Sequence, residues 1–226
     1  MESETDSLIV AISGTTGSGA REVGAHVAKA LSCRYLDKAI VLAVAEQMKD
    51  FAGRLGEQDE RLLREAMAPQ AIPKQSSQRR AVTESLMLSA DDLAFLPTQM
   101  ALIRAAATWG PLVIVGRAGR WILRDQPALL SVLLHAPLSV RVQRICGMYS
   151  LESEVVAEKI VGYCDDRREA FIRRVTGHQT ASVEHDVSLD TMKLGITGTL
   201  EVALLAVDHF LRQRAWSPGL AAVDPL

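Results

Sequence analysis

The stretch Leu8-Ile9-Val10-Ala11-Ile12-Ser13-Gly14-Thr15-Thr16-Gly17-Ser18-Gly19-Ala20-Arg21-Glu22 decides the fold, because an apolar run passes into a glycine-rich loop and then into a helical pattern. The backbone N–H groups of such a loop and the N-terminus of the following helix both attract an anion. The spacing of Gly14 and Gly19 fits a P-loop, but Ala20-Arg21 stands where Lys-Ser/Thr is usual. The sequence therefore predicts a phosphate-binding scaffold that lacks the usual lysine and magnesium-binding hydroxyl.

Composition excludes several classes of function. The chain has 226 residues, 48% of them hydrophobic, which suits one domain with a sizeable core. Its net charge of −2 gives no reason to expect a nucleic-acid partner. The three cysteines show no CxxC or metal-ligand spacing, which favours reduced thiols in a cytoplasmic protein. We see no signal peptide, and no apolar stretch reaches the roughly 20 residues of a membrane span, so we expect no membrane partner.

Apolar runs of strand length recur along the chain, and helical patterns separate them. Continuous apolar runs are typical of parallel strands covered on both faces, so the sequence predicts an α/β fold with crossover helices. Strands are expected at 8–12, 112–115 and 131–134, with shorter candidates at 34–37 and 187–189. Helices are expected at 20–32, 39–49, 97–109 and 155–175, and from Thr197 or Thr199 to about 212.

The loop supplies the candidate residues for binding a nucleotide cofactor. An ordinary glycine turn between a strand and a helix would show the same glycines, but the flanking elements favour phosphate binding. Arg21 could reach a phosphate from the first helical turn, or it could instead pair with a surface acid such as Glu22. The candidate set is Ser13, Gly14, Gly17, Ser18, Gly19, Ala20, Arg21 and Glu22.

Two residues near the carboxyl edge of the expected sheet are candidates for substrate binding. Arg117 follows the central strand through a glycine, at the edge where open α/β sheets bind ligands, and an arginine there suits a substrate phosphate. Asp37 lies just beyond the short second strand, where it could orient a substrate or merely cap the next helix. We expect Arg120 to lie in a basic surface loop.

Further arginines gather in the second half of the chain. Arg141 and Arg144 are three apart and share a helix face, and four more arginines occupy the helix expected at 155–175. Arginine-rich helices are usually solvated faces, yet phosphoryl transfer needs positive groups around the moving phosphate. An arginine-bearing lid would supply them and exclude water. The candidate catalytic residues are Arg21, Arg141 and Arg168.

Several short segments, taken in order, carry a resemblance. They are Ile12-Ser13, Gly17-Ser18-Gly19-x-Arg21-Glu22, Tyr35-Leu36-Asp37-Lys38, Val113–Arg117 with Trp121-Ile122-Leu123, Ala136-Pro137 with Arg141, Asp165 with Arg168, and Leu194-Gly195-Ile196. Together they resemble the cytidylate kinase-like family of P-loop proteins over about residues 8–207.

The resemblance implies a three-layer P-loop nucleoside kinase fold, with a parallel sheet of about five strands and helices on both faces. It implies a single domain over 1–226, with a helical acceptor-binding region at about 51–92 and a lid at about 150–185. It also implies ATP and Mg²⁺ as cofactors and small-molecule nucleotides as partners. The implied reaction is transfer of the ATP γ-phosphoryl group to a nucleoside monophosphate, with CMP or dCMP as the expected acceptor.

Two departures leave other functions open. Ala20 occupies the position of the lysine in cytidylate kinases, and Val115 occupies that of an aspartate. One electrostatic donor can be worth roughly 10²–10³ in rate. The alternatives are a catalytically degenerate nucleotide-binding protein and a phosphotransferase acting on a non-nucleotide small molecule. The sequence does not identify the magnesium ligands, for which Asp37 and Asp190 are only guesses.

Overall fold

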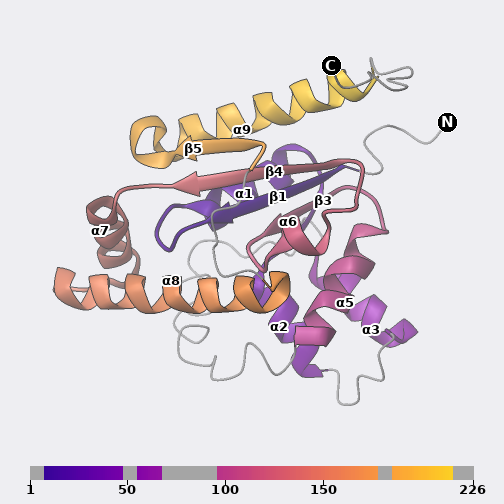
Figure 1. Ribbon diagram of the computed structural model, residues 1–226, viewed down its shortest axis with the longest axis horizontal. Coiled ribbons are helices and arrows are strands. Elements are labelled where there is room, and N and C mark those ends of the chain that lie inside the picture. The colour runs from indigo at the N-terminus through magenta and orange to yellow at the C-terminus, as the bar shows by residue number, and fades with distance from the viewer. Residues whose placement is uncertain (1–7, 48–54, 68–95, 178–184, 216–226) are drawn as a thin grey trace.

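A parallel sheet of five strands forms the centre of the computed structural model, which describes residues 8–47, 55–67, 96–177 and 185–215 (Figure 1). The strand order is β2-β3-β1-β4-β5, and every neighbouring pair is parallel. The strands are β1 (Ile9–Gly14), β2 (Arg34–Leu36), β3 (Leu112–Val115), β4 (Leu129–His135) and β5 (Val187–Asp190). The predicted α/β class and its parallel sheet are confirmed.

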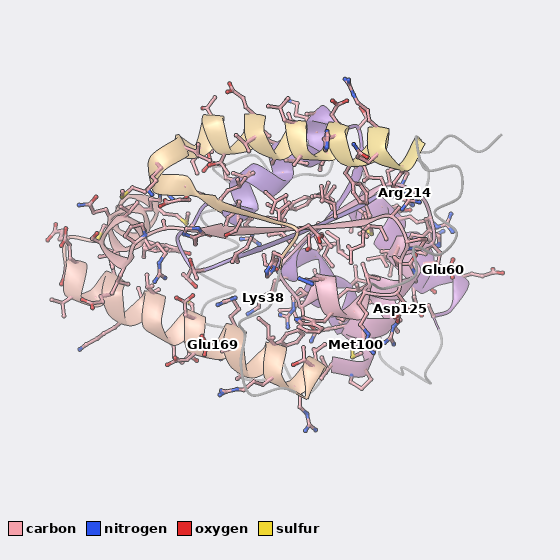
Figure 2. All side chains as sticks on the ribbon, turned by 45° about the horizontal axis from the view of Figure 1, so that its top comes forward. Lys38, Glu60, Met100, Asp125, Glu169 and Arg214 are labelled. Atoms are coloured by element: carbon pink, nitrogen blue, oxygen red, sulfur yellow. The ribbon has the colours of Figure 1, made fainter. Side chains whose placement is uncertain are left out.

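Helices cover both faces of this sheet. Figures 1 and 2 show α8, which carries Glu169, and α9, which carries Arg214, on opposite sides of the strands. The helices are α1 (Ala20–Ala30), α2 (Lys38–Gln47), α3 (Glu57–Ala66), α5 (Leu96–Ala107), α6 (Gly119–Ile122), α7 (Leu138–Tyr149), α8 (Glu154–Thr176) and α9 (Thr191–Ala215).

The continuous apolar run of β1 is explained by two separate cores. Leu8, Val10 and Ile12 point to one face, where they pack with α1 and α9. Ile9 and Ala11 point to the other face, where they pack with α2, α3, α5 and α6. Side chains alternate between the faces of a strand, so a strand buried on both sides is apolar at every position.

Helix α9 begins earlier than the sequence suggested. Asp190 Oδ1 accepts hydrogen bonds from the backbone N–H groups of Met192 and Lys193, which starts the helix at Thr191. A break at Gly195, whose φ of 65° and ψ of 175° are not helical, then separates this first turn from the rest. The prediction that this helix starts at Thr197 or Thr199 is therefore wrong, because α9 starts at Thr191. The two threonines lie just beyond the break.

The other bounds agree with the sequence within a few residues. Strand β4 extends the predicted 131–134 at both ends. Helix α3 falls inside the region expected to bind the acceptor, but 48–54 and 68–95 lie outside the described residues. Most of the expected lid is α8, and 178–184 lie outside the described residues.

One helix bears on the expectation of no membrane span. Residues Thr191–Arg214 of α9 are long and apolar enough to cross a bilayer by length and composition. A helix that covers the core of a globular domain meets the same test. In this structure α9 packs on α1, β4 and β5, with Ala203 and Val207 buried in the first core.

Candidate functional site

The glycine-rich loop joins β1 to α1 in a shape that only glycine permits at two positions. Gly17 and Gly19 have φ of 82° and 85°, in the left-handed region that L side chains avoid. A Cβ atom on Gly17 would lie 2.8 Å from the carbonyl oxygen of Arg141. Gly19 also serves as the N-cap of α1 and packs against Ile196. The predicted strand–loop–helix unit is present, and the N-terminus of α1 faces the carboxyl edge of the sheet.

Two arginines of α7 hold the loop from outside. Arg141 Nη1 donates to the carbonyl oxygen of Thr16 at 3.2 Å, and Arg144 Nη1 donates to that of Gly17 at 3.3 Å. Arg144 also donates to the hydroxyl and the carbonyl oxygen of Thr191, at 2.7 and 2.9 Å. The pair thus connects α7 to the loop and to the start of α9. Their three-residue spacing, noted in the sequence, places both guanidinium groups on the loop.

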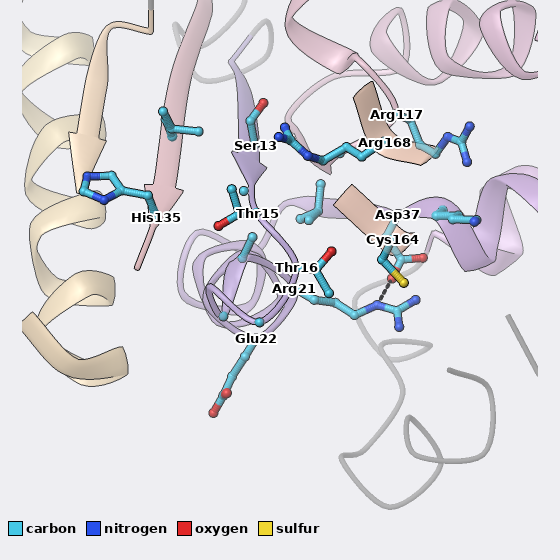
Figure 3. A pocket seen from close by; sticks show the side chains of 18 of the residues that line it. Ser13, Thr15, Thr16, Arg21, Glu22, Asp37, Arg117, His135, Cys164 and Arg168 are labelled. Carbon is cyan, nitrogen blue, oxygen red and sulfur yellow. Dashed lines mark hydrogen bonds and ion pairs between the residues drawn. The ribbon is translucent and has the colours of Figure 1, made fainter. Parts of the chain in front are cut away.

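Arg21 turns toward the second strand (Figure 3). Its Nε donates to Asp37 Oδ2 at 2.7 Å, and the same oxygen accepts from the Tyr35 hydroxyl at 3.2 Å. Asp37 Oδ1 accepts from the backbone N–H of Ile40, so this carboxylate also caps α2. Arg21 therefore pairs with the nearly buried Asp37, and the interpretation of Asp37 as the cap of the next helix is confirmed.

This cluster shifts the pKa values of its members. Burial alone would lower the pKa of Arg21, but the charge and hydrogen bond of Asp37 raise it above its ordinary value. Burial, followed by the charge of Asp37, raises the pKa of Tyr35 well above 10. Arg21 therefore stays charged and Tyr35 stays neutral at physiological pH.

The Tyr35 pKa predicts how stability depends on pH. An unfolded tyrosine loses its proton near pH 10, while the folded one retains it, so its contribution is complete below about pH 10 and is lost as pH rises further. We expect the urea midpoint to fall between about pH 9 and 11 more steeply in the wild type than in Tyr35→Phe. Tyr163→Phe, at an exposed tyrosine, is the matched control and should follow the wild type. Equal slopes for all three proteins would contradict this assignment.

A cavity of about 790 Å³ opens at the carboxyl edge of the sheet, beside the loop. The loop and the start of α1 form one wall, and the segment after β3 together with α8 forms another (Figure 3). The residues predicted from the sequence that it brings together are Ser13, Gly14, Gly17, Gly19, Ala20, Arg21, Glu22, Asp37, Arg117 and Arg168. Ser18 is fully buried beneath the loop, and Arg141 lies on the loop's outer side.

The segment after β3 has an unusual backbone. Gly116, Arg117 and Ala118 have φ of 70°, 54° and 53°, which is three left-handed residues in succession. Only the glycine could be anticipated from sequence. Such strain persists where the surrounding structure fixes it, which is common at ligand sites. Arg117 is 7% exposed, and its guanidinium stacks on the Phe171 ring of α8 at 3.7 Å.

Two further arginines that line the cavity each carry a buried nitrogen without a hydrogen-bond partner in the described part of the chain. Arg120 Nη1 and Arg168 Nε are buried atoms with no hydrogen-bond partner among the described residues. Both side chains line the cavity. The expectation that Arg120 lies in a surface loop is therefore wrong, because α6 turns it inward after the left-handed segment. Buried guanidinium nitrogens without protein acceptors suit an anionic ligand.

Helix α8 supplies residues that the sequence analysis missed. On its charged second half the sequence analysis predicts only Arg168 as a catalytic residue. The sequence pattern that could have revealed the others is a stripe of residues at helical spacing, all of which line the cavity. They are Ile160, Tyr163, Cys164, Arg167, Arg168, Phe171 and Ile172.

The described residues include no group of three or more His, Cys, Asp or Glu side chains that could hold a metal ion. Of the two guesses for magnesium ligands, Asp37 lines the cavity, while Asp190 caps α9. The three cysteines are free thiols, as expected.

A family model described as the cytidylate kinase-like family matches residues 9–193 of this sequence. The chain belongs to the cytidylate kinase-like family. The matched residues run from β1 through the loop, the cavity and α8 to the start of α9. The resemblance seen in the sequence is thereby confirmed. No curated protein matches this family member significantly.

Solved structures place the family member among P-loop kinase folds. An uncharacterized protein from Eubacterium ventriosum ATCC 27560 is similar, with a TM-score of 0.63, 18% identity and coverage of 89% of this chain and 98% of that one. A gluconokinase from Sinorhizobium meliloti 1021 is similar with a TM-score of 0.52 and 15% identity, and the match covers 94% of this chain and 98% of that one. Shikimate kinase from Acinetobacter baumannii, solved with shikimate, has a TM-score of 0.50 and 13% identity, and the match covers 90% of this chain and 95% of that one. At these identities the similarity establishes the fold alone.

Proposed function

We propose that this chain is a phosphotransferase that transfers the γ-phosphoryl group of ATP to a nucleoside monophosphate, with CMP or dCMP as the acceptor. The family membership supports a nucleotide or small-molecule kinase. The observation that carries the proposal is the cavity, which has an anion-attracting loop on one side and Arg120 and Arg168 on another; each of these arginines has a buried nitrogen with no partner among the residues that the structure describes. Phosphoryl transfer relies on this kind of positioning and charge neutralisation.

The proposed roles follow from position. The loop Ser13–Glu22 binds the nucleotide phosphates through backbone N–H groups and the N-terminus of α1. Arg117 and Arg120 hold the acceptor phosphate, and Arg168 stabilises the charge of the moving group. The aromatic side chains that line the cavity offer flat apolar surface to a base; they are Trp121, Tyr149, Tyr163 and Phe171.

Magnesium fits this site only in a limited way. Asp37 is the carboxylate in the cavity that we consider as a magnesium ligand, and its Oδ2 already accepts hydrogen bonds from Arg21 and Tyr35. Mg²⁺ usually takes one or two protein carboxylates and completes its shell with substrate phosphates and water. In this proposal Asp37 would hold the ion, which would supply neutralisation of the phosphate charge. Arg21 could replace the missing lysine only by leaving Asp37.

An ADP-release assay tests the proposal, with ATP and Mg²⁺ and a panel of CMP, dCMP, UMP, AMP, shikimate and gluconate as acceptors. Release that is dependent on CMP or dCMP is the expected result. Release with shikimate or gluconate alone would identify a phosphotransferase of non-nucleotide substrates. If no acceptor makes ADP release faster than it is with ATP alone, the result would count against a kinase.

A nucleotide-binding protein without transfer is the second candidate. It is favoured by Ala20 at the lysine position and by the engagement of Arg21 with Asp37. Calorimetry that detects ATP or CMP binding in the absence of turnover would select it.

Arg120→Ala tests the acceptor end of the cavity. We expect the KM for the acceptor to rise roughly tenfold, since a charge-assisted hydrogen bond is lost, while the KM for ATP stays within about twofold. Arg124→Ala is the matched control, because this neighbouring arginine is exposed and pairs with Asp125 at the surface. Equal rises for both substrates would refute this division of the cavity.

A further inference from the structure

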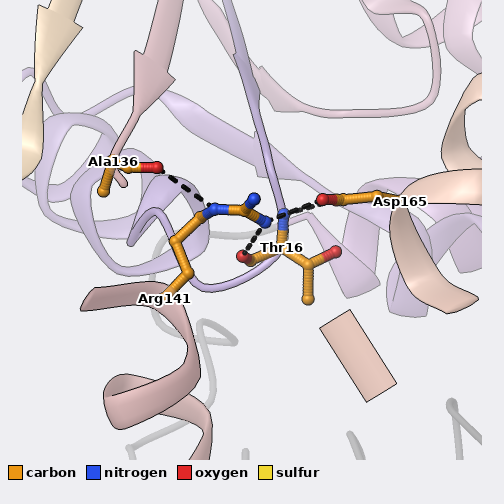
Figure 4. Close-up of polar contacts among 4 residues, drawn as sticks. All are labelled: Thr16, Ala136, Arg141 and Asp165. Carbon is orange, nitrogen blue, oxygen red and sulfur yellow. Dashed lines mark hydrogen bonds and ion pairs between the residues drawn. The ribbon is translucent and has the colours of Figure 1, made fainter. Parts of the chain in front are cut away.

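A carboxylate from α8 occupies one of the anion-attracting amides of the loop (Figure 4). The backbone N–H of Thr16 donates to Asp165 Oδ1 at 2.8 Å. Arg141 Nη1 donates to the other carboxylate oxygen, Oδ2, at 2.7 Å and to the Thr16 carbonyl oxygen at 3.2 Å. The carboxylate therefore lies between a loop amide and a guanidinium, which are the two kinds of donor that bind a phosphate oxygen.

The surroundings make this contact strong. The side chains of Arg141 and Asp165 are only 13% and 19% exposed, so water competes weakly for them. Arg141 is anchored independently, because its Nε donates to the Ala136 carbonyl oxygen at 3.1 Å. If Asp165 moved away, Arg141 and the Thr16 amide would remain in place with no anion between them.

The contact also joins the loop to the helix that lines the cavity. Asp165 lies on α8 beside Cys164 and one turn before Arg168, and both of these line the cavity. A ligand phosphate at the Thr16 amide and the observed position of Asp165 exclude each other, because both require the same donor. Displacing the carboxylate would therefore be coupled to a movement of Asp165 or of α8.

We propose that Asp165 is an internal competitor for the phosphate loop, and that it sets the affinity of this site by filling the Thr16 amide and Arg141 until a polyphosphate displaces it. This inference rests on the proposed function, since it assumes that the loop binds phosphates. It assigns to Asp165 an effect opposite in sign to that of a binding residue: removing it strengthens binding.

Calorimetric titration of the full chain with inorganic pyrophosphate tests the proposal, using the wild type, Asp165→Asn, Asp165→Ala and Asp166→Asn. The last variant removes the same charge from the exposed neighbouring residue on α8, so it controls for net charge. We expect both Asp165 variants to bind pyrophosphate about tenfold more tightly than the wild type, as when a competent state populated about a tenth of the time becomes dominant. Asp166→Asn should stay within about twofold.

Hydrogen exchange at the Thr16 amide provides a second measurement that needs no ligand. This proton should exchange faster in Asp165→Ala than in the wild type, because its acceptor is gone, and added pyrophosphate should protect it again. Unchanged or weaker pyrophosphate binding in both Asp165 variants would overturn the proposal, as would a failure of pyrophosphate to bind any of the four proteins. Tighter binding without phosphoryl transfer to any acceptor would uphold it while rejecting the kinase activity.

Discussion

Gly17→Ala is expected to reduce the free energy of unfolding by about 3 kcal/mol, the sum of a left-handed backbone penalty and a steric conflict. The new Cβ would lie 2.8 Å from the carbonyl oxygen of Arg141 and 3.0 Å from its Cα. These are backbone atoms of α7, which cannot rotate away as the end of a side chain can. The loop would have to shift from α7, which would disturb the carbonyl contacts of Arg141 and Arg144.

The functional effect of Gly17→Ala should be as large. A displacement near 1 Å in a positioning element can slow a reaction roughly 10²-fold, so we expect that loss in phosphoryl transfer and weaker binding of pyrophosphate. Urea unfolding and calorimetry measure the two effects. Gly177→Ala is the matched control, because Gly177 has a φ of 69° but no atom within 4 Å of an added Cβ. It should cost only about 1 kcal/mol and leave binding unchanged. Equal losses in the two variants would show that backbone strain alone, and not contact with α7, explains Gly17.

The sheet could be predicted because its strands are apolar throughout. Leu8–Ile12 and Leu112–Val115 sit between two helical layers, so no polar residue interrupts them. The edge strand β5 gave a weaker signal, since it is short and only Leu189 is buried in it. The start of α9 could not be predicted, because it depends on the cap by Asp190 and on the break at Gly195.

The site was only partly predictable. The loop and Arg117 follow from local pattern, since each comes directly after a buried strand. The partner of Arg21 required three-dimensional information, because Asp37 is 16 residues away while Glu22 is adjacent. The contact between Thr16 and Asp165 spans 149 residues and exists only after α8 has packed over the loop. The resemblance singles out Asp165 and not the exposed Asp166, but the contact of Asp165 with the loop follows only from the three-dimensional structure.

The proposed kinase activity requires other groups to supply the positive charge of the missing lysine. Arg144 lies against the carbonyl oxygen of Gly17, and Arg120 and Arg168 line the cavity, whereas the charge of Arg141 is paired with Asp165. The positive charge that one ammonium would concentrate is spread over guanidinium groups from several elements. Phosphoryl transfer requires charge around the moving group but not from a particular residue type.

Arg168→Ala is accordingly expected to reduce kcat for phosphoryl transfer roughly 10²–10³-fold, the effect of removing one preorganised donor from a site where charge develops. Its Nε is buried with no acceptor in the described part of the chain, so the unliganded protein should unfold at nearly the same urea concentration after the change. Arg168→Lys should recover part of the rate, because an ammonium restores charge but not the planar fork.

Arg173→Ala is the matched control for this prediction. Arg173 lies on the same helix, carries the same charge and is exposed outside the cavity, so its loss should leave kcat within about twofold. The acceptor KM separates two roles for Arg168. A fall in kcat at constant KM indicates a group that acts on the transition state, whereas a rise in KM at constant kcat indicates uniform binding of the acceptor phosphate. Turnover of Arg168→Ala within threefold of the wild type would remove Arg168 from the reaction altogether.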